Sequence, residues 1–149
     1  MINVLAILDK YKKPILIVLA VLVFLVLWKN RNRIVRRVAG NIAADAEDKV
    51  YLETVAKQIN RQNLTYTDAE YQEMAARIYK AVKGVGTDEK AIETVFGKLR
   101  TSDDLSKLIA TFGVRDKLTM TEWLYDDLNN KEIGKLNDIL KRNGIKKNL

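Results

Sequence analysis

The longest uninterrupted apolar stretch of the chain runs from Ile15 to Trp28 and contains no charged or polar side chain. Pro14 precedes it, and proline is tolerated in the first turn of a helix because the amide it lacks would have no partner there. These fourteen residues would rise only about 21 Å, against a hydrocarbon core of about 30 Å. Interfacial side chains at both ends can extend such a span: Tyr11, Lys12, Lys13 and Trp28. The pattern predicts a short N-terminal tail at residues 1–13 and a transmembrane helix at residues 14–28.

The residues on either side of this segment predict whether it is cleaved, how it is oriented and what it contacts. The run ends in Leu27-Trp28-Lys29 without a pair of small residues for cleavage, which favours an uncleaved anchor over a signal peptide. Five cations follow it against three lysines before it, so we expect a single-pass protein with its C-terminal domain on the cytoplasmic or internal side. The same five cations are expected to contact anionic lipid headgroups, with nucleic acid as the alternative: Lys29, Arg31, Arg33, Arg36 and Arg37.

Residues 29–62 predict a basic juxtamembrane helical stalk. Apolar residues recur between Ile34 and Ile59 at steps of mostly three and four, and there is no proline. Such a stripe needs a partner to cover it. Packing on the chain's own following domain is favoured, and packing on a second copy of the chain or on another protein is the alternative.

Five further helical patterns follow in residues 63–149. A Thr67–Glu70 capping box opens the first at residue 68, and Gly84 and Gly86 end it. The others begin near residue 88, at residue 101 or 102, near residue 120 and near residue 131, and Asn143-Gly144 ends the last. No strand pattern is evident, so we expect an all-α fold. The side chains at core spacing are Tyr71, Met74, Ala75, Ile78, Val82, Ile92, Val95, Phe96, Leu99, Leu105, Leu108, Ile109, Phe112, Trp123, Leu124, Leu128, Ile133, Leu136, Ile139 and Leu140.

Composition argues against an enzyme. The 149 residues include no cysteine and no histidine, which removes disulfides, zinc and haem ligation by those residues, and imidazole catalysis. The two serines, Ser102 and Ser106, have no neighbouring base, and Ser102 lies where a helix cap is common. We therefore expect no small-molecule substrate.

Net charge separates the two halves of the chain. Of the formal +7, most belongs to residues 1–62, which hold 11 Lys and Arg against 5 Asp and Glu. Near the other end lies a smaller basic group that could contact phosphates, or could simply be a solvated terminus that complements the helix dipole: Lys141, Arg142, Lys146 and Lys147.

The second half of the chain, about residues 68–143, resembles one annexin repeat. The resemblance is carried by the loop sequence Ala81-Val82-Lys83-Gly84-Val85-Gly86-Thr87-Asp88-Glu89, by Ala91-Ile92, by the Arg100-Thr101-Ser102 break and by Leu124 through Leu128. It implies a five-helix annexin-repeat-like bundle. It also implies Ca²⁺ bound by the backbone carbonyls of Val82, Gly84 and Gly86, completed by Asp127 or its neighbour Asp126. Carbonyl and carboxylate oxygens are the ligands that Ca²⁺ prefers.

An ordinary structural explanation of the same loop stays open. The glycines would permit a tight turn between helices, Thr87 would be the N-cap of the second helix, and Asp88 and Glu89 would favour its first turn. On that view Asp126 and Asp127 are solvated loop acids.

These patterns favour a non-enzymatic, membrane-anchored structural or interaction protein. It could be a membrane component of a larger assembly, such as the virion of a lipid-containing bacteriophage, and its expected partners are the bilayer and a protein or a second copy of itself. One alternative is a calcium-dependent phospholipid-binding module. A lysis or pore-forming membrane protein is another, although the predicted span has no polar stripe.

Overall fold

The computed structural model describes residues 42–84 and 86–149, and these belong to one unit of the chain that starts at residue 39. Six α-helices account for 70% of the interpretable region, so the predicted all-α class is confirmed there. The predicted transmembrane helix, residues 14–28, and the first part of the stalk lie outside the described residues. Within the described residues, no helix combines the length and the apolar character needed to cross a bilayer.

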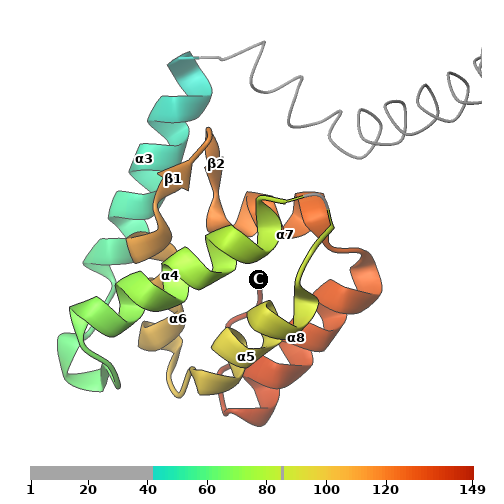
Figure 1. Ribbon diagram of the computed structural model, residues 1–149. Coiled ribbons are helices and arrows are strands. Elements are labelled where there is room, and N and C mark those ends of the chain that lie inside the picture. Colours follow the sequence, from blue (N-terminus) through green and yellow to red (C-terminus); the bar gives the residue numbers. More distant parts are fainter. Residues whose placement is uncertain (1–41, 85) are drawn as a thin grey trace, which may run out of the picture. The chain divides into compact units, whose positions relative to one another are not determined.

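The elements follow one another through short connections (Figure 1). Their bounds are α3 Ile42–Lys57, the 3-10 turn η1 Arg61–Asn63, α4 Asp68–Val82, α5 Glu89–Lys98, α6 Ser102–Phe112, β1 Val114–Arg115, β2 Leu118–Thr119, α7 Met120–Asp127 and α8 Asn130–Arg142. Helix α4 packs against both α5 and α6, while α8 packs on α5 and α3 packs on α6. The five predicted helices of the second half are therefore all present, each within a residue or two of its expected bounds.

Local sequence explains where these helices begin. The Thr67 hydroxyl accepts from the Glu70 amide and the Glu70 carboxylate accepts from the Thr67 amide, which is the predicted capping box. Thr101, and not Ser102, caps α6, and reciprocal boxes also open α7 at Thr119 and α8 at Asn129. Four of the five helices after η1 thus carry their start signal within four residues of sequence.

The end of α8 is equally local. Gly144 takes a left-handed backbone with φ of 80°, the Gly144 amide donates to the Lys141 carbonyl, and the Ile145 amide donates to the Leu140 carbonyl. This is the Schellman arrangement, which a residue with a Cβ adopts only at a cost. Ile145 is buried, as the accompanying apolar contact requires.

One core runs through all the described helices, and every side chain predicted at core spacing is buried in it. Trp123, Tyr71 and Phe96 are the largest fully buried side chains. The core also includes residues outside the predicted set, namely Val55, Ala81, Leu118, Met120 and Ile145. Burial at about 25 cal/mol per Å² of apolar surface is the main stabilising contribution in such a bundle.

The expectation that no strand is present was wrong in one place. Val114 pairs with Thr119 and Arg115 with Leu118 in a two-stranded antiparallel hairpin. Its two loop residues, Asp116 and Lys117, have φ of 50° and 66°, as a type I′ turn requires. Strands of two residues are too short to show alternation, and the turn lacks the glycine that usually marks it.

Helix α3 is the described part of the predicted stalk, and it packs on α6 of the same chain. Val55 joins the core, but the stripe is not buried along its length: Val50 is 64% exposed and Tyr51 is 42% exposed. Packing on the domain therefore covers the end of α3 next to η1 and leaves apolar surface on the preceding turns.

Candidate functional site

The connection between α4 and α5 contains the residues of the candidate calcium site. Val82 is the last, buried residue of α4, while Gly84 and Gly86 are exposed. Gly86 has a left-handed φ of 88°, whereas Gly84 is not among the residues with positive φ. The Asp88 amide donates to the Ala81 carbonyl across the turn at 3.1 Å, which closes the loop. Only one of the two glycines is thus required by backbone conformation.

The N-cap of α5 differs from the prediction. The Asp88 carboxylate accepts from the Ala91 amide at 2.9 Å and caps the helix, so the expectation that Thr87 would be the cap was wrong. The Thr87 hydroxyl is buried without a hydrogen-bond partner among the described residues. Asp and Thr are both good caps, and the turn at Gly86 places Asp88 rather than Thr87 at the start of the helix.

Asp126 and Asp127 lie on the last turn of α7 and not in a loop, and both are half-buried. The connection from α7 to α8 is short, because Leu128 leaves α7 with an extended backbone and Asn129 immediately caps α8. The two acids are therefore held by a helix, which fixes their direction more firmly than a loop would.

A cluster of aromatic and charged groups around Tyr79 joins the end of α4 to α7. The Tyr79 ring meets the Trp123 ring edge to face at 5.8 Å between centroids, and the Phe112 ring at 6.1 Å. The Arg115 guanidinium lies 5.0 Å from the centre of the Tyr79 ring. We call these four residues, with Asp116, the Tyr79 cluster. Its contacts bring together the two helices whose ends carry the candidate calcium ligands.

The hairpin completes the Tyr79 cluster. The Tyr79 hydroxyl donates to the Asp116 carboxylate at 2.8 Å, and the Trp123 ring N–H donates to the Arg115 carbonyl at 2.8 Å. The Arg115 Nε in turn donates to the Phe112 carbonyl at 3.1 Å. The ends of α4 and α6 are thereby connected to α7 through the hairpin, residues 114–119.

The donor set of the candidate calcium site consists of backbone carbonyls and one or two carboxylates. In the described part of the chain, no three His, Cys, Asp or Glu side chains are grouped to hold a metal ion. Side-chain ligation alone would therefore be insufficient there, and a bound Ca²⁺ would depend on loop carbonyls, which Ca²⁺ accepts. A Cβ added at Gly86 would meet no atom within 4 Å, so the space beside the loop is open. These residues are compatible with a sparse site completed by water or by a phosphate oxygen.

An acidic pair at the start of α6 has a role that the sequence did not reveal. Asp104 is fully buried, and its carboxylate accepts from the Thr65 amide and hydroxyl, from the Tyr71 hydroxyl, and from the Arg100 and Thr101 amides. Burial alone would raise the pKa of Asp104, but these hydrogen bonds, that from Tyr71 foremost, hold it below its ordinary value. Burial and the same bond to Asp104 raise the pKa of Tyr71.

Asp103 fastens the same connector from the outside. Its carboxylate accepts from the Asn60 amide at 3.0 Å and from the Asn63 side chain at 2.8 Å. Together Asp103 and Asp104 hold residues 60–65 against the start of α6, which is how α3 is positioned against the bundle. The pair is structural, and the satisfied carboxylate of Asp104 leaves it no capacity for acid/base chemistry.

The remaining predicted site residues lie outside the described residues, and the structure places none of them. These are the proposed headgroup contacts Lys29, Arg31, Arg33, Arg36 and Arg37 and the interfacial residues Tyr11, Lys12, Lys13 and Trp28. The structure therefore bears on the calcium ligands alone.

Comparison of the chain with models of known protein families, with curated proteins and with solved structures found no match. The likeness to one annexin repeat therefore depends on the residues of this chain alone.

Proposed function

We propose that this chain is a non-enzymatic, membrane-anchored interaction protein, in which residues 14–28 form the anchor and the helical domain contacts a partner. The observation that carries the proposal is the exposed apolar surface of α3. Val50 and Tyr51 lie in solvent on a helix whose other face is committed to α6. Apolar side chains so exposed on a helix that follows a predicted membrane span suit a contact with another protein.

Site-specific photo-crosslinking tests this function in native membranes. A photoreactive residue at position 50 of the full chain should give one discrete crosslinked product, because the partner covers that side chain. Lys131 is exposed on α8, which packs on α5, and is the matched position on a different, charged surface; a crosslinker there should give little product. Equal, diffuse labelling at both positions, or none at either, would refute the proposed contact.

The size of the crosslinked product separates the two kinds of partner. A product of twice the chain mass would identify a second copy, whereas another mass would identify a different protein, including a component of a larger assembly such as a virion. Either result supports an interaction role.

A calcium-dependent phospholipid-binding module is the second candidate, and the annexin-like loop favours it. Its support is the exposed, open loop around Gly86, together with the two half-buried acids at the end of α7. Titration of Ca²⁺ into the full chain, read by tryptophan fluorescence, should show saturable binding that an Asp126→Asn, Asp127→Asn double variant weakens. Asp138→Asn on exposed α8 is the control. No saturable change at millimolar Ca²⁺ would remove this candidate and leave the first intact.

A further inference from the structure

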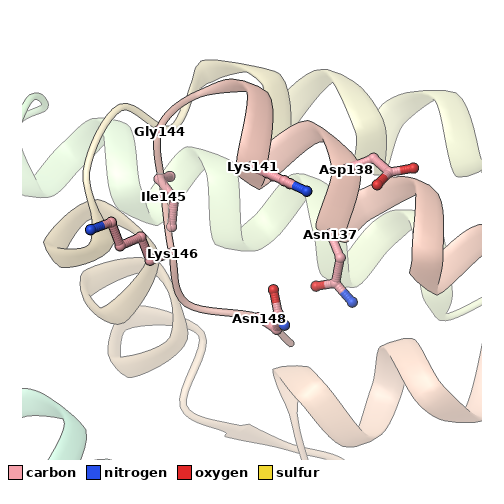
Figure 2. Close-up of a pocket in the computed structure, with 7 residues that line it drawn as sticks. All are labelled: Asn137, Asp138, Lys141, Gly144, Ile145, Lys146 and Asn148. Carbon is pink, nitrogen blue, oxygen red and sulfur yellow. The ribbon is translucent and has the colours of Figure 1, made fainter.

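The segment after α8 folds back on the bundle and forms a recess. Its cavity, about 610 Å³, is lined by Asn137, Asp138 and Lys141 of α8 and by Gly144, Ile145, Lys146 and Asn148 of the returning segment (Figure 2). That volume falls within the range of small-molecule sites. The recess lies away from the Gly86 loop in sequence, and it includes Lys141 and Lys146 of the basic group for which a phosphate contact was one of two expectations.

The walls of the recess are fixed by several contacts. Ile145 is buried, and the Leu149 amide donates to the Asn137 side-chain oxygen at 3.0 Å. The Lys147 ammonium donates to the Ser106 hydroxyl of α6 at 3.1 Å, and the Tyr125 hydroxyl of α7 donates to the Leu149 carbonyl. Contacts with three different helices thus hold five residues that have no secondary structure of their own, so the recess is pre-formed.

Most of the polar side chains that line the recess carry donors, and the Asp138 carboxylate is the single charged acceptor among them. Figure 2 shows the Lys141 ammonium and the Asn137 and Asn148 amides directed to the space between α8 and the returning segment. No ion pair or hydrogen bond joins the Lys141 ammonium to any residue that the structure describes. The Asn137 oxygen is engaged by the Leu149 amide, which orients the Asn137 NH₂ group as a donor. An ammonium and an amide N–H at one recess favour an anion.

The charge of the residues around the recess also favours an anion. Residues 137–149 hold four cations, Lys141, Arg142, Lys146 and Lys147, and a single acid, Asp138. Asp138 lines the recess together with Lys141 and offsets part of this charge, which leaves the cations in excess. Lys147 contacts a neutral hydroxyl, so its charge is not cancelled. A dianion would therefore meet a positive field at this end of the domain.

We propose that this recess binds a phosphate group, either free or as a phosphomonoester, with the Lys141 ammonium and the Asn137 NH₂ as its principal donors. A phosphate near pH 7 carries close to two charges and offers three oxygens to separate donors. The cavity exceeds the size of one phosphate, which leaves room for a small organic group beyond it.

The test is a titration of the full chain, labelled with ¹⁵N-asparagine, in a detergent with a sugar headgroup. Inorganic phosphate is one titrant and glycerol 3-phosphate, the headgroup of phosphatidic acid without its acyl chains, is the other. Ionic strength is held constant with chloride, so that screening does not change. The Asn137 side-chain signal, assigned by its absence in Asn137→Asp, should shift saturably.

Three variants locate the site. Lys141→Gln should weaken binding about tenfold, as expected for one charge-assisted bond. Asn137→Asp keeps the oxygen that holds the Leu149 amide but replaces the donor with a negative charge, and binding should be lost. Lys131→Gln removes the same charge from an exposed position on the same helix, and affinity should remain within about twofold.

The two titrants distinguish the source of the phosphate. Tighter binding of glycerol 3-phosphate would indicate a lipid headgroup or similar monoester, and binding of inorganic phosphate alone would indicate the free ion. No saturable shift with either, or an equal loss in Lys141→Gln and Lys131→Gln, would overturn the proposal. Neither outcome touches the α3 contact, which is tested separately at position 50.

Discussion

At the scale of single residues, Asp104 is the strongest polar determinant of this fold. One buried carboxylate accepts five hydrogen bonds from three separate stretches of chain: residue 65, residue 71 and residues 100–101. A buried charge with that many donors is stabilising only while every donor is present. Substitution and protonation should therefore both be costly.

Asp104→Asn should lower the free energy of unfolding by about 3 kcal/mol, because an NH₂ group would face donors that need an acceptor. Asp103→Asn is the matched control, since its bonds are exposed, and should cost about 1 kcal/mol. Chemical denaturation monitored by circular dichroism measures both. Equal effects of the two substitutions would contradict the assigned role.

Acid should weaken the folded state through the same group. The folded pKa of Asp104 lies below its ordinary value of 3.8, so its contribution is fully present above that value and is lost as pH falls through the folded pKa. The denaturation midpoint should thus fall more steeply below about pH 4 in the natural chain than in Asp104→Asn.

Lys117 has a left-handed φ of 66° and is exposed. A residue with a Cβ pays about 1 kcal/mol there. Lys117→Gly should therefore raise the thermal midpoint, and Lys117→Val should lower it, because a β-branched side chain is the least tolerant of that conformation. A lower midpoint for the glycine variant would mean that Lys117 has a contact that outweighs its strain.

At the scale of elements, the Tyr79 cluster decides how α4, α6, the hairpin and α7 meet. The Tyr79 ring contacts Phe112 and Trp123, and the Tyr79 hydroxyl donates a hydrogen bond to the Asp116 carboxylate. Tyr79→Phe should cost under about 1 kcal/mol, since the lost hydrogen bond is exposed. Tyr79→Leu should cost about 2 kcal/mol through loss of the aromatic contacts.

Thermal unfolding of the two Tyr79 variants distinguishes packing from hydrogen bonding. Near-ultraviolet circular dichroism should lose the Trp123 signal in Tyr79→Leu but keep it in Tyr79→Phe. Loss of that signal in both variants would show that the hydroxyl, and not the ring, positions the hairpin.

Helices and core were predictable because their signals are local and periodic. Thr67 and Glu70 are three residues apart, Asn143-Gly144 ends a helix by itself, and apolar spacing alone selected every predicted core side chain. The parts that failed were not local. Asp104 receives its donors from as far as residue 65, and the Asp116-Lys117 turn lacks the usual glycine. Nothing near Asp88 or Thr87 indicates which of two good caps the loop will bring into place.

The candidate sites divide in the same way. The Gly84–Gly86 loop was visible in the sequence because its glycines and its acids form a pattern. The recess at Asn137 and Lys141 was only hinted at by the basic residues from Lys141 to Lys147. It depends on a segment that folds back through contacts with Ser106 and Tyr125, and such long-range contacts leave no periodic trace.

At the scale of the whole molecule, we propose that the predicted anchor holds the all-α domain at a membrane, where α3 contacts a partner. Residues 1–62 carry most of the net positive charge of the chain, so attraction to anionic lipid and insertion into the bilayer both predict membrane association. Surface attraction and insertion differ in how they respond to salt. At about 1 M salt the Debye length falls to about 3 Å, which removes surface attraction but not insertion.

Flotation of the full chain with native membranes at about 1 M salt therefore tests the central claim most directly. The chain should float with the membranes, and a variant with Leu22→Arg and Leu25→Arg in the apolar run should stay at the bottom, because charges in the hydrocarbon core are costly. Recovery of the natural chain at the bottom of the gradient would contradict a membrane anchor.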